Sequence, residues 1–168
     1  MRYIIIILVA ICVFAACSED KFTTYDSTRY LYFAKGITAD SITESFFFYP
    51  DETTHDIRLE LLFAGDPVTE NMTYRIEVDE SLTTAVKGTD FDFESERTWQ
   101  AGEERDTLVL KLIKTAKLDN QMFRVVLKVS PTTDFEIGPT KNARSQRIAF
   151  TWEAIRSEEH TSELQSQR

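Results

Sequence analysis

Residues 56–64 read DIRLELLFA and are followed at once by the turn-forming sequence GDP. Every second residue from 57 to 63 is apolar, and Arg58 and Glu60 stand between apolar neighbours. Successive side chains of a strand point to opposite faces, so this period of two places the apolar residues on one face. Gly and Pro then end the extended run. The stretch therefore predicts a strand whose one face is buried.

The same kind of run recurs on both sides of this strand. The further runs, rich in aromatic and β-branched residues, cover 29–34, 41–49, 72–78, 107–113, 123–129 and 147–152. No stretch keeps a helical period, and strands recurring at intervals of roughly 10–16 residues are typical of an antiparallel sandwich. We predict an all-β fold, an antiparallel immunoglobulin-like β-sandwich, over residues 29–155. The aromatic run FFFY at 46–49 is expected to be a strand buried on both faces.

The first 17 residues, MRYIIIILVAICVFAAC, have the layout of a secretory signal, with Arg2 before an apolar run. The run is shorter than the roughly 20 residues of a transmembrane helix. Small residues before Cys17 resemble the bacterial lipobox, which implies cleavage after residue 16 and acylation of Cys17. We expect a signal peptide at 1–16, and a lipidated N-terminus and tether at 17–28. The alternative is an ordinary cleaved signal.

The residues that follow Cys17 bear on localisation. Glu19 and Asp20 resemble the signal that directs Bacteroidetes lipoproteins to the outer face of the outer membrane. A solvated linker is the alternative, so the periplasmic and external faces both stay open. Acyl chains contribute about 0.8 kcal/mol per buried CH₂, and two or three give lasting attachment to a membrane. We expect a protein of the cell envelope, anchored to the outer membrane by lipid.

Residues 156–166 read RSEEHTSELQS, which is the translation of a common short-read sequencing adapter. We expect residues 156–168 to be such an artefact and the genuine sequence to diverge near Ile155. This predicts a sandwich that is truncated at its C-terminal side.

Two blocks of sequence carry a family resemblance. The opening CSEDKFTTYDSTRYLYFA and the later segments ITESFFFYP, TAVKGTDFDFE, TWQAGEERDTLVLKL and FRVVLKVSPTTDFEIGP resemble a family of Bacteroidetes lipoproteins labelled domain of unknown function 4843. The resemblance implies an accessory role near outer-membrane nutrient uptake. The block 84–129 also resembles a Calx-beta module, but residues 118–121 lack its paired glutamates, so calcium binding does not transfer.

Charge and thiol content reduce the number of possible functions. The formal net charge is −9 and no basic stripe is present, which argues against a nucleic-acid partner. Cys12 lies in the signal and Cys17 carries the lipid, so the mature domain has no thiol for a disulfide, a zinc site or a nucleophile. His55 is the only histidine before residue 156, and we expect it in a surface turn before a strand. We therefore expect no enzyme and no cofactor.

A few residues remain as candidate sites. Asp90, Asp92, Glu94 and Glu96 alternate with other residues and would face one side of a strand, where carboxylates could bind calcium. We favour a solvated edge strand, whose charges discourage pairing. Sugars stack on exposed rings, and the candidates for this contact are Trp99, Trp152 and Tyr49, with Trp99 as the ligand-binding candidate. Ser27 resembles a Bacteroidetes O-glycosylation site.

Three functions are consistent with these features. The first is a lipid-anchored, non-catalytic accessory domain that binds an outer-membrane protein or a glycan. The second is a structural or adhesive β-sandwich module. The third is a fragment of an enzyme whose active site lies beyond Ile155. We expect the first.

Overall fold

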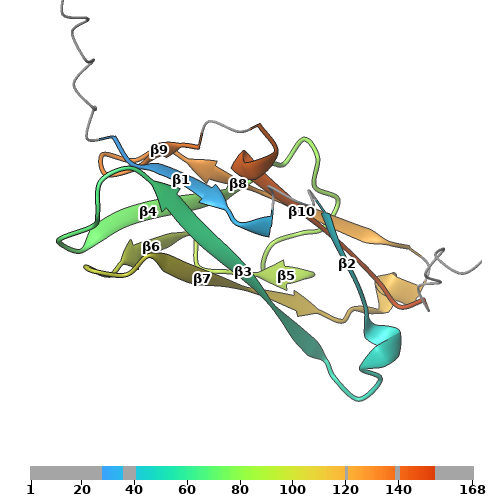
Figure 1. Ribbon diagram of the computed structural model, residues 1–168. Helices are drawn as coiled ribbons and strands as arrows, with labels where there is room; N and C mark the ends of the chain where they lie inside the picture. The colour runs from blue at the N-terminus through green and yellow to red at the C-terminus, as the bar shows by residue number, and fades with distance from the viewer. Residues whose placement is uncertain (1–27, 36–40, 120, 139–140, 154–168) are drawn as a thin grey trace, which may run out of the picture.

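The computed structural model describes residues 28–35, 41–119, 121–138 and 141–153. The predicted β-sandwich is confirmed: two five-stranded sheets pack face to face (Figure 1). Among the described residues there is no α-helix, and no helix long and apolar enough to span a membrane.

The strands follow one another along the chain as β1 (Tyr30–Phe33), β2 (Ser41–Ser45), β3 (Thr54–Ala64), β4 (Met72–Val78), β5 (Phe91–Asp92), β6 (Glu96–Trp99), β7 (Arg105–Ile113), β8 (Phe123–Ser130), β9 (Glu136–Ile137) and β10 (Ser145–Thr151). Within the described ranges, the 3₁₀ turns η2 (Phe46–Phe48), η3 (Ala116–Asp119) and η4 (Lys141–Arg144) lie between them. All seven predicted strands exist, with ends shifted by a few residues. The short β9 was not predicted, and β5 and the start of β6 replace the single edge strand expected at 90–96.

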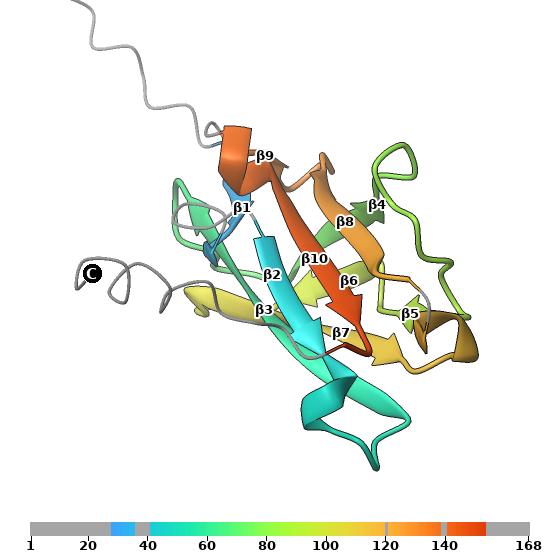
Figure 2. The ribbon, with the colours of Figure 1, turned by 90° about the vertical axis from the view of Figure 1, so that its right-hand side faces the viewer.

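The first sheet has the order β5-β7-β3-β1-β9, and the second has the order β2-β10-β8-β4-β6. The sheets are mixed rather than purely antiparallel, because β1 pairs with β9 and β2 pairs with β10 in parallel. Both parallel pairs involve the N-terminal segment, because this segment contributes β1 to the first sheet and β2 to the second. Figure 2 shows β2 lying beside β10 at the edge of the second sheet.

The strand predicted from residues 56–64 is β3, the central strand of the first sheet. It pairs with β7 from Thr54↔Ile113 to Leu62↔Arg105. Its predicted inward residues Ile57, Leu59 and Leu61 are buried, as the period of two requires. They meet apolar residues of β4, β7, β8 and β10 in one core between the sheets. Burial of this apolar surface is the main driving force of the fold.

The run 46–49 is the clearest departure from the predicted strands. The strand β2 ends at Ser45, and residues 46–48 form the 3₁₀ turn η2 instead of continuing it. Phe46 is buried, whereas Phe47 and Phe48 are 54% and 60% exposed. The expectation of a strand buried on both faces is wrong, because the chain turns here from the second sheet into the first.

Candidate functional site

Trp99 lies in the core and not on a binding surface. Its side chain is 0% exposed, and its ring packs against Phe63 and Tyr74 at centroid distances of 5.2 and 5.9 Å. Its Nε1 donates a 2.8 Å hydrogen bond to the carbonyl oxygen of Glu103. A buried indole whose N–H has found a partner is a core residue. The expected ligand contact of Trp99 is therefore wrong.

The four carboxylates proposed for calcium do not share one strand face. Asp92 ends β5 in the first sheet, whereas Glu96 begins β6 in the second, so the chain changes sheets between them. Asp90 is buried, where its carboxylate accepts from the backbone N of Val86 (2.9 Å) and from Thr115 Oγ1 (3.3 Å).

Nor are the other carboxylates of this set arranged as ligands. Glu96 pairs with Arg75 at 2.8 Å, and Glu94 with Arg97 at 3.6 Å. No group of three or more acidic, histidine or cysteine side chains in the described part of the chain could hold a metal ion. The expected single-faced cluster is wrong, and the reading as a solvated edge also fails for Asp90, which anchors a turn.

Two sequence-predicted residues cannot be placed. Cys17, expected to carry a lipid, and Ser27, expected as a glycosylation site, both lie outside the described residues. The same holds for the expected signal peptide at 1–16, for the tether before Thr28 and for residues 156–168.

The most exposed aromatic cluster lies where the chain turns from β2 into β3. We call Phe47, Phe48, Tyr49 and His55 the aromatic apex. The rings of Phe47 and Phe48 meet edge to face, with centroids 5.6 Å apart and planes at 89°. Tyr49 stacks on His55 at 4.1 Å and 24°. Exposed apolar side chains that gather at one place mark an interaction site more often than single ones do.

Local hydrogen bonds fix the turn that carries the apex. Ser45 caps η2, because its Oγ accepts from the backbone N of Phe47 (3.1 Å) and donates to the carbonyl oxygen of Glu153 (2.6 Å). The backbone N of Tyr49 donates to the carbonyl oxygen of Phe46 at 3.0 Å. The buried Phe46 ring anchors the turn in the core, so the next two rings must point outward.

Lys114 contacts the chain beside the apex. Lys114 Nζ donates to the carbonyl oxygen of Pro50 (2.8 Å) and lies 3.7 Å from the centroid of the Trp152 ring. Trp152 itself is half-buried against the core. Of the sugar-stacking candidates, Tyr49 therefore has one face covered by His55, and Trp152 has one face covered by Lys114. Lys114 thus links the loop that follows the apex rings to Trp152.

His55 lies in β3 rather than in the turn before it. It is the second residue of that strand, opposite Leu112 of β7. Its Nδ1 lies 3.0 Å from Oε2 of Glu52, and its ring also meets Phe46 edge to face. The histidine therefore positions Tyr49 within the apex.

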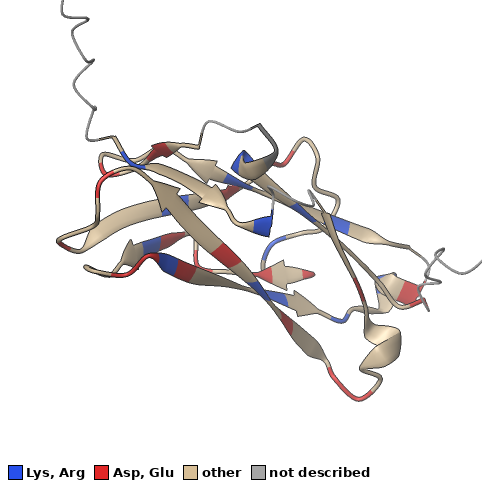
Figure 3. Ribbon diagram, in the orientation of Figure 1, with Lys and Arg blue, Asp and Glu red and all other residues tan. Residues whose placement is uncertain are grey.

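The charges near the apex are mainly acidic. Figure 3 shows that η2 carries no charged residue, whereas the loop between it and β3 is acidic. The charged residues of this loop are Asp51 and Glu52, both exposed. The apex therefore presents two apolar rings beside two carboxylates.

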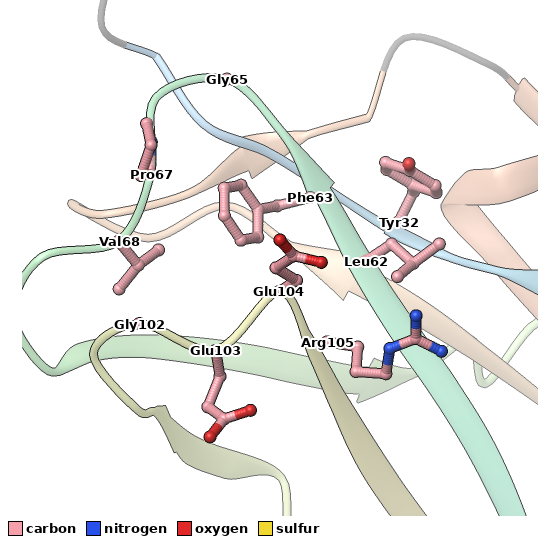
Figure 4. A pocket seen from close by; sticks show the side chains of 10 residues that line it. All are labelled: Tyr32, Leu62, Phe63, Gly65, Pro67, Val68, Gly102, Glu103, Glu104 and Arg105. Carbon is pink, nitrogen blue, oxygen red and sulfur yellow. The ribbon is translucent and has the colours of Figure 1, made fainter.

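A pocket of about 420 Å³ lies at the other end of β3 (Figure 4). Phe63 and Val68 give it apolar walls, and Tyr32, Glu104 and Arg105 give it polar ones. Arg105 is held by Glu60 at 2.7 Å, and Figure 4 shows Glu103 pointing away from Phe63. The pocket could hold a small ligand that carries both apolar and hydrogen-bonding groups.

A partly buried polar group joins the two sheets near this pocket. The Tyr74 hydroxyl donates to Oδ2 of Asp106 at 2.6 Å, and Arg97 Nη2 lies 3.2 Å from Oδ1 of the same carboxylate. Burial, reinforced by Asp106, raises the pKa of Tyr74 well above its ordinary value. The phenol therefore stays neutral and acts as a donor, which makes this group a structural bridge.

Sequence reasoning named Tyr49 as a sugar-stacking candidate, but it missed Phe47 and Phe48 as exposed residues because it placed them in a buried strand. A capping Ser45 before the aromatic run and Pro50 after it were the available signals. Ser before a run favours the start of a helical turn, and Pro favours its end.

Solved structures share this fold. The apo form of the Calx CBD1 domain matches with a TM-score of 0.51 and 12% identity, over 76% of this chain and 99% of that one. The calcium-binding domain CBD12 of CALX1.1 matches with a TM-score of 0.52 and 13% identity, over 73% and 45%. A protein of unknown function from Bacteroides ovatus matches with 0.51 and 16%, over 71% and 43%.

These likenesses establish the fold alone. The chain spans less than half the length of the second and third of these structures. No curated protein matches the chain. A family model described as "Domain of unknown function (DUF4843)" matches residues 25–160, which include every described strand. The sandwich, with its two mixed sheets and its aromatic turn between β2 and β3, is thus a member of the DUF4843 family.

Proposed function

We propose that this protein is a non-catalytic binding module of the cell envelope, held to a membrane through a lipid on Cys17, which recognises a partner protein with its aromatic apex. The observation that carries the proposal is the exposure of two adjacent rings, Phe47 and Phe48, on a turn fixed from both sides. Large aromatic anchors on rigid elements are typical centres of protein interfaces.

The ring geometry favours a protein over a glycan. Sugars need exposed, flat ring faces, but Phe47 and Phe48 stand at 89° to each other. Tyr49 and Trp152 each have one face covered, by His55 and by Lys114. Two rings that stand out edge to face fit an apolar pocket of a protein. The exposed carboxylates of Asp51 and Glu52 favour a partner with a basic rim around that pocket.

The position of the apex suits a tethered protein. Tyr30 at the start of β1 pairs with Ala64 at the end of β3, whereas the apex lies at the start of β3 (Figure 1). A strand rises about 3.3 Å per residue, so β3 separates the two ends by roughly 35 Å. A lipid before β1 would therefore hold the apex away from the membrane surface.

The experiment that tests this function is photo-crosslinking in the native cells. A photoreactive phenylalanine analogue replaces Phe47 in the full-length protein, with and without Phe48→Ser. We expect a crosslink to one discrete envelope protein, lost in the Phe48→Ser variant. Leu82, which is 44% exposed in the connection after β4, supplies the matched control position.

Either of two outcomes would contradict the proposal. The same crosslink from position 82 would show that the apex does not select the partner. Binding of the purified protein to an oligosaccharide array, with loss on Trp152→Ala but not on Phe48→Ser, would assign the apex region to a glycan instead.

The lipid anchor has its own test. Metabolic labelling with radioactive palmitate should label the protein, and Cys17→Ser should abolish the label and release the protein from membranes. Labelling that survives Cys17→Ser, or none in the unaltered protein, would exclude the anchor while leaving the apex to be judged separately.

A further inference from the structure

One edge of β3 has no neighbouring strand in the described part of the chain. Among the described residues, the register pairs β1 with residues 61–64 of β3, and a further backbone hydrogen bond runs from the backbone N of Ala34 to the carbonyl oxygen of Glu60 (3.0 Å). On its other side β3 pairs with β7 as far as Thr54. Within the described ranges, residues 54–59 therefore have a strand partner on one side alone.

The register also identifies the backbone groups at this edge. The backbone N of Lys114 donates to the carbonyl oxygen of Thr53, so the odd-numbered residues direct their backbone groups toward β7. In an antiparallel pair these groups alternate sides along the strand. Asp56 and Arg58 therefore direct their N–H and C=O groups to the free edge. Such groups are a template for another strand.

A pocket and a buried amide lie at this edge. The pocket, of about 380 Å³, is lined by the end of β1, by Arg58–Glu60 and by Gln146 of β10. Gln146 is only 1% exposed, yet its Oε1 has no hydrogen-bond partner, and its Nε2 makes only a 3.4 Å contact with the carbonyl oxygen of Arg147. A buried amide without a full set of partners is destabilising, so it calls for a ligand that supplies them.

We propose that the free edge of β3 is a docking site for an extended segment of a partner protein. The segment would continue the line of β1, run antiparallel to β3, and pair its backbone with Asp56 and Arg58. One of its backbone N–H groups or side-chain hydroxyls would donate to Gln146 Oε1. Main-chain pairing of this kind gives affinity, and alternate side chains give specificity.

Charge identifies the kind of segment. Arg58 is exposed and makes no ion pair among the described residues, whereas the neighbouring Glu60 is held by Arg105 at 2.7 Å. A carboxylate placed opposite Arg58 would therefore be the matching side chain. Charged residues can also keep an edge from pairing. That role does not account for the buried, unsatisfied amide of Gln146, which strand addition does.

The test uses the purified protein and two fluorescein-labelled heptapeptides of alternating threonine and valine, one with aspartate and one with lysine at the centre. Fluorescence anisotropy measures binding, and amide hydrogen exchange measures protection. We expect the aspartate peptide to bind at least about tenfold more tightly. It should slow exchange at the amides of Asp56 and Arg58, and Arg58→Glu should reverse the preference between the peptides.

Two variants separate docking from folding. Asp56→Pro removes an N–H that points to the free edge, so it should keep the β7 pairing and the melting temperature while abolishing binding. If this variant misfolds, Gln146→Leu tests the same site, because it removes the acceptor from the pocket and should weaken binding.

Unchanged exchange at Asp56 and Arg58, or equal affinity for both peptides, would overturn the proposal. Protection at these amides that rises with protein concentration in the absence of peptide would also overturn it, since the edge would then pair with a second copy of the chain.

Discussion

The hydroxyl of Tyr74 on β4 donates a 2.6 Å hydrogen bond to Oδ2 of Asp106 on β7, so this bond links the two sheets. A bond from a buried donor to a charged acceptor is stronger than a neutral one. We expect Tyr74→Phe to lower the free energy of unfolding by about 1.5–3 kcal/mol, measured by urea denaturation. A loss within error of zero would show that the bond does not contribute to stability.

The raised pKa of Tyr74 predicts how the free energy of unfolding changes at alkaline pH. Burial and then Asp106 raise the pKa of Tyr74 above its ordinary value of 10.0, so the folded state holds this proton more tightly than the unfolded state. The stabilisation that Tyr74 contributes to the folded state is complete below pH 10 and is lost as the pH rises further. We expect the free energy of unfolding to fall by up to about 1.4 kcal/mol per pH unit above pH 10 through Tyr74. Matched urea titrations of Tyr74→Phe should lack this component; identical slopes would refute it.

We expect Ser45 to hold the turn that carries the apex, without contact between its side chain and the apex rings. Its hydroxyl makes both the cap of η2 and the 2.6 Å bond to the carbonyl oxygen of Glu153. Ser45→Ala should cost about 1–2 kcal/mol of stability. It should also weaken the crosslink from position 47, because the rings lose their fixed positions. Ser41→Ala, at the exposed start of β2, is the control that should change neither quantity.

Gly65 should tolerate no side chain. Its φ is +135°, and a Cβ there would lie 2.6 Å from the backbone oxygen of Thr28. At Gly102, with φ +80°, a Cβ would meet nothing within 4 Å. We expect Gly102→Ala to show backbone strain alone, about 1–3 kcal/mol, and Gly65→Ala to exceed it. Thermal melting of the two variants decides the order, and an equal effect would argue against the close approach of Thr28.

Asp90 and Asp92 form a matched pair for the calcium question. The buried carboxylate of Asp90 accepts two hydrogen bonds, whereas Asp92 is exposed. We expect Asp90→Ala to destabilise the fold by about 1–3 kcal/mol and Asp92→Ala by less than about 0.5 kcal/mol. Both effects should be independent of added calcium in thermal melts. A calcium-dependent rise in melting temperature, lost in either variant, would restore the metal site.

The long strands could be predicted because their residues alternate. In β3, β4 and β7 the side chains on one face are apolar and those on the other are mostly polar, so sequence alone fixes the buried face. The two-residue strands β5 and β9 are too short to show any period. Their positions follow from tertiary pairing with β7 and β1, which no local pattern contains.

The candidate site was harder to predict for the same reason. Trp99 is flanked by Thr98 and Gln100, so nothing near it in the sequence indicates the aromatic core that it joins. The carboxylates at 90–96 alternate as in one strand, yet the chain passes between the sheets within them. Four consecutive aromatic residues at 46–49 resemble a buried strand, and only the cap and the core position of Phe46 turn two of them outward.

The parallel pairing of β2 with β10 has a consequence for the order in which the molecule can fold. Ser41 is opposite Arg147 in this register, and Ser45 is opposite Thr151. A strand near the start of the domain therefore cannot pair until a strand near its end is available. Closing such long loops is slow compared with forming a local hairpin. A chain that crosses a membrane N-terminus first would present β1 and β2 before their partners emerge. Folding would then finish only after β10 has emerged. Until then β2 has no strand to pair with, and the second sheet lacks both β10 and β2 at that edge.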